Sequence, residues 1–272
     1  MTQIKLIAID LDGTLLTDDK QIPQENLQAI QEVVDAGIQV VVCTGRTRQG
    51  AERFYTQLPT SEDEYLIVQN GSLTYQLPDL QLMNAYSVDP AVAQSAYQAL
   101  AKYQGQVQLV AFDQDHFYLI GSQEPSQLTL ADSQTLQMPI HYLSEEEFLE
   151  SDRLNKYMFI GESQWIDDLE ANLPVDLKTS ADPVRSQPFL LEILPQSVNK
   201  ATALKALAQH LGLGPDQVMA IGDQLNDLEM LKWVDHSVAM GSGVATVKEA
   251  CRHITLSNQE AGVAYALRNF VQ

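Results

Sequence analysis

Hydrophobic positions in the first part of the chain alternate between short apolar runs and segments with helical spacing. Residues 4–9 form an isoleucine-rich run, which is typical of a buried parallel strand. Residues 23–35 carry Leu27, Ile30 and Val33 at helical spacing, and residues 38–43 form a second, β-branched run. This strand–helix–strand order predicts a parallel sheet with right-handed crossovers.

The pattern changes near residue 87 and returns near residue 189. Between these points, strands predicted at 107–112, 117–120, 156–160 and 175–178 are scattered among helices predicted at 91–102, 145–149 and 163–173. After residue 189 the alternation resumes, with a helix predicted at 200–211 and a strand at 218–221. We therefore expect an α/β fold with a doubly wound, Rossmann-like parallel-sheet core and an inserted α+β domain. The core comprises residues 1–85 and 190–272, and the insert comprises residues 86–189.

The net charge of the chain limits the classes of partner that it can bind. The 36 acidic residues outnumber the 16 lysines and arginines, and the formal net charge is −20. Nucleic acids and anionic membranes need a basic surface, so neither is expected as a partner.

Cys43 and Cys251 have no metal-ligand spacing, and no apolar run approaches the roughly 20 residues of a membrane span. With no secretion leader at the N-terminus, we expect a cytoplasmic protein that is a monomer or a weak homodimer.

Two carboxylates follow the first predicted strand. Side chains two residues apart on an extended chain share one side, so Asp10 and Asp12 face the same way. Two carboxylates this close repel each other. Such a pair is tolerated where it binds a cation or takes part in proton transfer. Gly13 permits a sharp turn, and Thr14 can bond the turn backbone. A helix cap or turn would explain one aspartate, but not both.

Two further segments offer groups that suit an anion. Thr44 and Gly45 follow the second strand, where a hydroxyl and backbone N–H groups beside a helix start can hold a phosphate. Lys200 lies in the first turn of a predicted helix, against the helix dipole, which favours a role in binding an anion. Taken singly, Thr44 would be interpreted as an ordinary helix cap and Lys200 as a solvated surface lysine.

A fourth polar segment follows the strand at 218–221. Asp223 and Asp227 are four residues apart, so one helical face can carry both toward a cation, and Asn226 lies between them. The alternative is an acidic first turn of a capped helix. Together the four segments converge on one sheet edge and supply the parts that phosphoryl transfer needs, with carboxylate oxygens that suit Mg²⁺.

These segments resemble, in order, the motifs of the haloacid dehalogenase-like phosphatases. Residues 10–14 read DLDGT, residues 44–46 read TGR, Lys200 follows, and residues 222–227 read GDQLND. The last form is similar to that of the Cof-type branch, whose sugar-phosphatase-like members carry an inserted α/β cap of the C2 type. The late pairs Met240-Gly241 and Ser257-Asn258 also resemble that branch, whereas Ala261 stands where it commonly has an acidic residue.

The resemblance implies roles for individual residues. Asp10 would be the nucleophile that forms an aspartyl-phosphate, and Asp12 the general acid and base. Mg²⁺ would be held by Asp10, by the backbone carbonyl of Asp12 and by Asp223, with Asp227 nearby. The phosphate would be held by Thr44, Gly45, Lys200 and Asn226. The residues expected to line the substrate site are Arg46, Asn70, Gly71 and, in the cap, Arg185.

The sequence thus predicts a Mg²⁺-dependent phosphatase for small phosphorylated metabolites, with sugar phosphates preferred. A phosphomutase or phosphotransferase of the same superfamily, which passes the phosphoryl group to a sugar, is the alternative enzyme. A signalling module with an aspartyl-phosphate as its output is disfavoured by Asp12 and by the insert of roughly 100 residues, because receiver domains are single and small. A catalytically silent binding protein is disfavoured because every motif residue is present.

Overall fold

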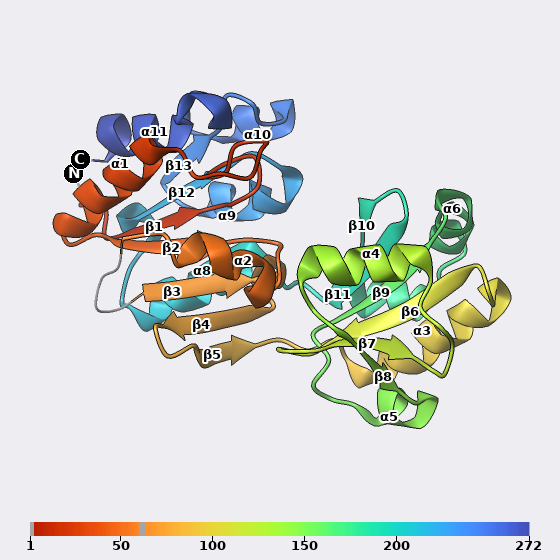
Figure 1. The fold of residues 1–272 in the computed structure, drawn as a ribbon. Helices are drawn as coiled ribbons and strands as arrows, with labels where there is room; N and C mark the ends of the chain where they lie inside the picture. Colours follow the sequence, from red (N-terminus) through yellow and green to blue (C-terminus); the bar gives the residue numbers. More distant parts are fainter. Residues whose placement is uncertain (1–2, 60–63, 272) are drawn as a thin grey trace. The chain divides into compact units, whose positions relative to one another are not determined.

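The computed structural model describes residues 3–59 and 64–271, and the chain divides into two compact units (Figure 1). The first unit comprises residues 1–47, 51–84 and 199–272, and the second comprises residues 48–50 and 85–198. Each unit has its own sheet and its own hydrophobic core.

The sheet of the first unit has, in the described part of the chain, the strand order β14-β13-β12-β1-β2-β3-β4-β5. Its parallel strands are β1 (Leu6–Ile9), β2 (Gln39–Cys43), β3 (Glu64–Val68), β12 (Val218–Gly222), β13 (His236–Ala239) and β14 (His253–Ile254). Beyond β3 the sheet continues with the antiparallel β4 (Leu73–Leu77) and with β5 (Gln81–Ala85). The central register aligns Ile9 with Val42 and with Ile221, so these three strands end level.

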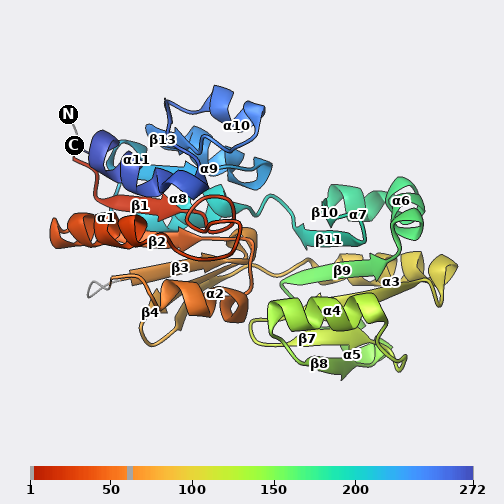
Figure 2. The same cartoon turned by 45° about the horizontal axis from the view of Figure 1, so that its top comes forward.

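Helices cover both faces of this sheet (Figure 2). Ile7 and Ile9 face the helices α1 (Gln24–Asp35), α2 (Arg48–Tyr55) and α11 (Gly262–Phe270). Leu6 and Ala8 point the other way, toward α8 (Lys200–His210), α9 (Leu228–Trp233) and α10 (Ala245–Ala250). Because alternate strand residues are apolar on both faces, the sheet is buried between two helical layers. The predicted doubly wound α/β fold is confirmed.

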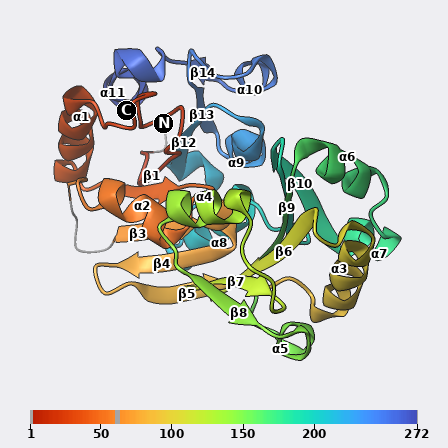
Figure 3. The ribbon, with the colours of Figure 1, turned by 45° about the vertical axis from the view of Figure 1, so that its right-hand side comes forward.

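The second unit is built on a sheet with the order β10-β11-β9-β6-β7-β8. Its strands are β6 (Val107–Phe112), β7 (Phe117–Ile120), β8 (Ile140–Leu143), β9 (Lys156–Gly161), β10 (Ala181–Gln187) and β11 (Leu190–Pro195). One face packs against α3 (Ala93–Leu100), α5 (Glu145–Glu150), α6 (Ser163–Ala171) and α7 (Val175–Thr179). The other face packs against α4 (Gln127–Leu136), as Figure 3 shows.

The second unit holds the clearest errors of the sequence prediction. Residues 175–178 were expected as a strand but form the helix α7, which follows Pro174. Val175 and Leu177 alternate as in a strand, yet Val175 is 76% exposed and only Leu177 is buried. The helix α4 and the strands β8 and β10 were not predicted, because their apolar residues show neither clear helical spacing nor clear alternation.

Candidate active site

Functional side chains gather at the carboxyl ends of the parallel strands of the first unit. Asp10 follows β1, Thr44 follows β2 and Asp223 follows β12. Since these strands end level, the residues that follow them emerge side by side, which is where open α/β sheets place their ligands. Lys200 enters from the first turn of α8, and the side chain of Asn199 caps that helix by accepting the Thr202 N–H at 3.1 Å.

Lys200 lies between two carboxylates beneath this edge. Its Nζ donates to Asp10 Oδ1 and to Asp227 Oδ1, each at 2.6 Å, and its side chain is fully buried. Burial alone would lower the pKa of Lys200, but the charges of Asp10 and Asp227 outweigh burial and hold that pKa above its usual range. These two carboxylates therefore favour the ammonium form of Lys200 inside the protein.

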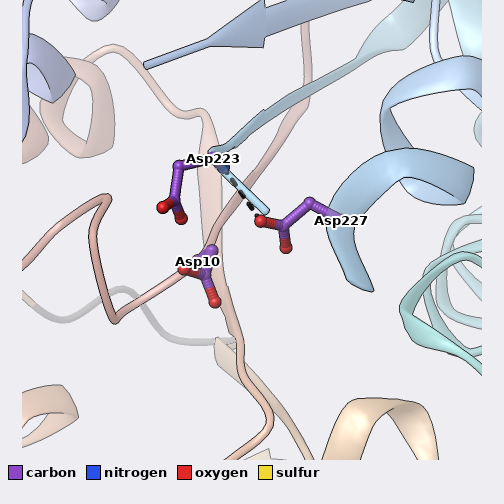
Figure 4. A group of neighbouring side chains, drawn as sticks. All are labelled: Asp10, Asp223 and Asp227. Carbon is purple, nitrogen blue, oxygen red and sulfur yellow. Dashed lines mark hydrogen bonds between the residues drawn. The ribbon is translucent and has the colours of Figure 1, made fainter. Parts of the chain in front are cut away.

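Asp10, Asp223 and Asp227 form a buried acidic cluster (Figure 4). Each can offer a carboxylate oxygen, and these oxygens lie within 4.8 Å of one another. Burial raises the pKa of Asp10 to about 8 although Lys200 opposes this effect. Burial and then the charge of Asp227 raise the pKa of Asp223 to about 6. The raised pKa values mean that burial and the neighbouring carboxylates disfavour the ionised forms of Asp10 and Asp223, and a hard cation bound between them would favour those forms.

Both oxygens of Asp227 have protein partners. Oδ1 accepts from Lys200, and Oδ2 accepts the backbone N–H groups of Asp223 at 2.9 Å and Gln224 at 3.1 Å. Gly222 makes room for this arrangement, because a Cβ there would lie 2.6 Å from Asp227 Cβ. Asp227 therefore organises the loop and Lys200, and leaves Asp10 and Asp223 as the more accessible oxygen donors.

Gly13 and Thr14 bring the first motif against Asp223. Thr14 Oγ1 donates to Asp223 Oδ1 at 3.1 Å. Gly13 has a φ of +80°, and a Cβ at this position would lie 2.4 Å from Asp223 Oδ2. Glycine is required here twice, by the left-handed backbone and by the close approach of the carboxylate.

The carboxylate of Asp12 lies outside the acidic cluster. Arg46 holds it with two hydrogen bonds, from Nε to Oδ2 at 2.6 Å and from Nη2 to Oδ1 at 2.7 Å. Lys20 Nζ also donates to Oδ1, at 2.7 Å. Partial burial acts against ionisation, but these hydrogen bonds outweigh it and lower the pKa of Asp12 to about 2. The structure thus pairs Arg46, expected in the substrate site, with Asp12.

The residues expected to hold phosphate surround the same edge. Thr44 Oγ1 accepts the backbone N–H of Arg46 at 3.1 Å. Asn226 Nδ2 donates to Asn70 Oδ1 at 3.0 Å, and Asn70 also borders Gly45, where a Cβ would lie 3.0 Å from that oxygen. Asn70 thereby links the second motif to the fourth.

Gly71 fixes the start of α8. It has a φ of +99°, and a Cβ there would lie 2.3 Å from the backbone oxygen of Asn199, the residue before Lys200. Gln69 and Asn70 also have positive φ values, of 50° and 54°. This short left-handed turn, η1 (Gln69–Gly71), therefore packs directly behind the helix that delivers Lys200.

Arg185 belongs to the second unit, on β10. Its guanidinium forms ion pairs with Asp167 and Glu170, both at 2.7 Å, and Nε donates to the backbone oxygen of Gln187 at 2.9 Å. These bonds fasten Arg185 to α6 within its own unit.

Lys20 contacts Asp12 but could not be selected as a site residue from sequence. It lies eight residues after Asp12 in a polar stretch of TDDK, where a lysine is ordinarily a solvated side chain. Its backbone φ is +56°, and its ammonium donates to Asp12 Oδ1 at 2.7 Å. By contrast, the helix cap by Asn199 was readable, because asparagine before a helical run is a common N-cap.

Comparisons with known proteins identify the family. Residues 7–267 match the model of the haloacid dehalogenase-like hydrolases, so the chain belongs to this family. YxeH of Bacillus subtilis is 33% identical over 98% of both chains. The 5-amino-6-(5-phospho-D-ribitylamino)uracil phosphatase YcsE of Bacillus subtilis is 31% identical over 98% of this chain and 96% of its own length.

A solved structure gives the same result. A haloacid dehalogenase-like hydrolase from Bacteroides thetaiotaomicron superposes with a TM-score of 0.86, at 27% identity, over 98% of this chain and 100% of its own. The resemblance read from the four motifs is confirmed: the chain is a phosphatase of the haloacid dehalogenase type, a phosphoric monoester hydrolase. In the described residues, no helix has the length and apolar character needed to cross a membrane.

Proposed function

We propose that the protein is a Mg²⁺-dependent phosphatase of small phosphorylated metabolites, preferably sugar phosphates, that works through an aspartyl-phosphate on Asp10. The observation that supports this proposal most directly is the buried ion pair of Lys200 and Asp10. Asp10 also belongs to the cluster of three carboxylates that can bind a cation. The name of the relative YcsE adds support for the substrate class, because it describes a phosphate on a sugar-derived ribityl chain.

The donor set of the cluster fits Mg²⁺. Asp10 and Asp223 would be its carboxylate ligands, the backbone carbonyl of Asp12 a third protein ligand, and Asp227 a nearby support. All are hard oxygen donors, and a bound cation would favour the ionised carboxylates of the buried cluster. When bound, Mg²⁺ would supply charge neutralisation to a phosphate placed beside Asp10.

The reaction would proceed in two halves, formation and then hydrolysis of the aspartyl-phosphate. In the first, a carboxylate oxygen of Asp10 attacks phosphorus and the bond from phosphorus to the alcohol oxygen breaks, while Asp12 gives its proton to that oxygen. In the second, water attacks phosphorus, Asp12 takes a proton from the water, and the bond to Asp10 breaks to release inorganic phosphate.

The surroundings of Asp12 suit the second half directly. Arg46 and Lys20 keep it a carboxylate, the form that accepts a proton from water. Proton donation in the first half requires Asp12 to leave these cations and turn toward the substrate. Arg46 would therefore act on the substrate site through Asp12.

Other residues would hold the substrate. Lys200, Asn226, Thr44 and the backbone N–H of Gly45 would bind the phosphate oxygens, and Asn70 and Gly71 would shape the wall beside them. We also propose that Arg185, on β10 of the second unit, contacts the part of the substrate other than its phosphate.

Phosphate release from a panel of sugar phosphates, nucleotides and an aryl phosphate tests this function. We expect turnover with Mg²⁺, none with a chelator, and a loss of at least about a thousandfold in Asp10→Asn. The matched control is Asp35→Asn, which changes a carboxylate at the far end of α1. Mg²⁺-independent turnover, or full activity of Asp10→Asn, would contradict the proposal, and formation of an isomeric sugar phosphate in place of free phosphate would indicate a mutase.

A further inference from the structure

Asn258 is a buried side chain in the late Ser257-Asn258 motif, to which the phosphatase mechanism assigns no role. It lies in the turn η6 (Asn258–Glu260), and only 4% of the residue is exposed. Its Nδ2 donates to the backbone oxygen of Leu16 at 2.9 Å and to Asp18 Oδ1 at 3.2 Å. Both partners are acceptors, so the amide has one sensible orientation. The bonds join the end of the chain to its beginning.

The loop that Asn258 holds is attached to Asp12 at two points. Leu16 forms an isolated parallel β-bridge with Asp12, which links the two backbones. The loop then closes where the Thr17 N–H donates to the Gln21 oxygen at 2.9 Å, and it carries Lys20 back to the Asp12 carboxylate. Any movement of Leu16 would therefore shift the backbone of Asp12 and the lysine that binds its side chain.

The segment that presents Asn258 is itself firmly fixed. The Gly241 N–H donates to the Leu256 oxygen at 3.0 Å, and Thr255 Oγ1 donates to the Gly262 oxygen at 2.6 Å. A Cβ on Gly262 would lie 2.3 Å from the oxygen of Leu256, so the chain packs here without spare room. Asn258 thus reaches the Asp12 loop from a rigid base.

A second buried asparagine holds the neighbouring carbonyl. Asn26 Nδ2 donates to the Leu15 oxygen at 3.3 Å, and its Oδ1 accepts the Ala264 N–H at 2.9 Å. The loop should therefore stay attached to the core when Asn258 is replaced. What is lost in that case is the fixed position of Leu16, not the fold of the loop.

We propose that Asn258 is a positioning residue for Asp12, acting by fixing Leu16 and Asp18 and hence the loop that sets both the backbone and the carboxylate of Asp12. This inference rests on the proposed role of Asp12 in proton transfer. It assigns the late motif a part in the chemistry although Asn258 touches neither the acidic cluster nor the phosphate-binding residues in the structure.

The experiment compares two substrates whose leaving groups differ in their need for protonation. An alkyl phosphate needs protonation of its leaving oxygen, whereas p-nitrophenyl phosphate needs little. In Asn258→Ala and in the shape-conserving Asn258→Asp, we expect kcat for a sugar phosphate to fall about tenfold more than kcat for p-nitrophenyl phosphate, with KM nearly unchanged. In an Asp12→Asn background, Asn258→Ala should cost less than about twofold for the sugar phosphate.

Thr255→Val is the matched control, because it removes a buried hydrogen bond from the same segment without touching the Asp12 loop. It should leave the ratio between the two substrates unchanged. A second readout, trypsin cleavage after the exposed Lys20, should become faster in both Asn258 variants and not in Thr255→Val.

Equal losses on both substrates, or cleavage at Lys20 that stays as in the wild type, would overturn the proposal and leave Asn258 a purely structural residue. A wild-type protein that releases phosphate from neither substrate would overturn the phosphatase function and this inference with it. A wild type that turns over both substrates, with an altered ratio only in the Asn258 variants, would support both.

Discussion

At the residue scale, a comparison of Gly13 with Gly37 distinguishes the effect of an unfavourable backbone conformation from the effect of a steric clash. Gly13 and Gly37 have φ values of +80° and +79°, but a Cβ on Gly13 would strike Asp223, whereas one on Gly37 meets no described atom within 4 Å. Both alanine variants should lose about 1–2 kcal/mol of stability in urea unfolding.

Only Gly13→Ala should also weaken Mg²⁺ binding, measured by calorimetry, and turnover, because it displaces a proposed ligand. Equal Mg²⁺ affinity in the two variants would show that Asp223 does not need the position seen in the structure.

Asp132 on α4 gives a pH prediction remote from the active site. Burial, aided by the charge of Glu192 and opposed by Lys156, raises the pKa of Asp132 to about 6, and its Oδ2 is buried without a hydrogen-bond partner. A raised carboxyl pKa means that the folded state holds the proton more tightly. The stability due to this group is therefore full below the usual pKa of 3.8 and is lost as the pH rises through about 6.

Asp132→Asn should accordingly be more stable than the wild type at pH 8 and about equally stable at pH 4. The midpoints of chemical unfolding at the two pH values are the measurement. A variant that is less stable than the wild type at pH 8 would mean that the ionised carboxylate has a favourable partner.

At the element scale, the start of α8 should matter more for catalysis than for stability. Asn199 caps α8, which carries Lys200, and Ser126 caps α4 in the second unit by accepting the Thr129 N–H. Replacing either cap with alanine should cost about 1 kcal/mol in unfolding experiments. Only Asn199→Ala should lower kcat/KM, because only its helix delivers a residue to Asp10; equal kcat/KM values would argue that Lys200 is held by its carboxylates alone.

The elements of the core were predictable and those of the insert were less so. Strands such as β1 and β12 are continuous apolar runs, and each ends in a chemically distinctive motif that marks its boundary. The insert gave weaker signals: α4 has polar residues on nearly every side, and Val175 and Leu177 imitate a strand after a proline. Local pattern fails where a short element takes its conformation from its neighbours.

At the scale of the whole molecule, the sequence predicted that Asp10, Thr44 and Asp223 follow strands that end at one edge of the sheet, but not how the side chains there pair. Parallel strands that end level explain why Asp10, Thr44 and Asp223 lie together, and this follows from topology. The capture of Asp12 by Arg46 and Lys20, and of Leu16 by Asn258, depends on side-chain rotamers and on a loop conformation. No spacing along the chain encodes these contacts, so only the structure reveals them.

The proposed mechanism depends above all on the phosphorylation of Asp10. The most direct measurement is the intact mass of the Asp12→Asn variant after a rapid acid quench from p-nitrophenyl phosphate and Mg²⁺, because loss of the general base should slow hydrolysis more than formation of the intermediate. We predict a mass increase of one phosphoryl group, mapped to Asp10 by peptide sequencing and absent in Asp10→Asn. Turnover by the wild type, without any phosphorylated protein in the quenched Asp12→Asn variant, or phosphorylation at another residue, would contradict the aspartyl-phosphate mechanism.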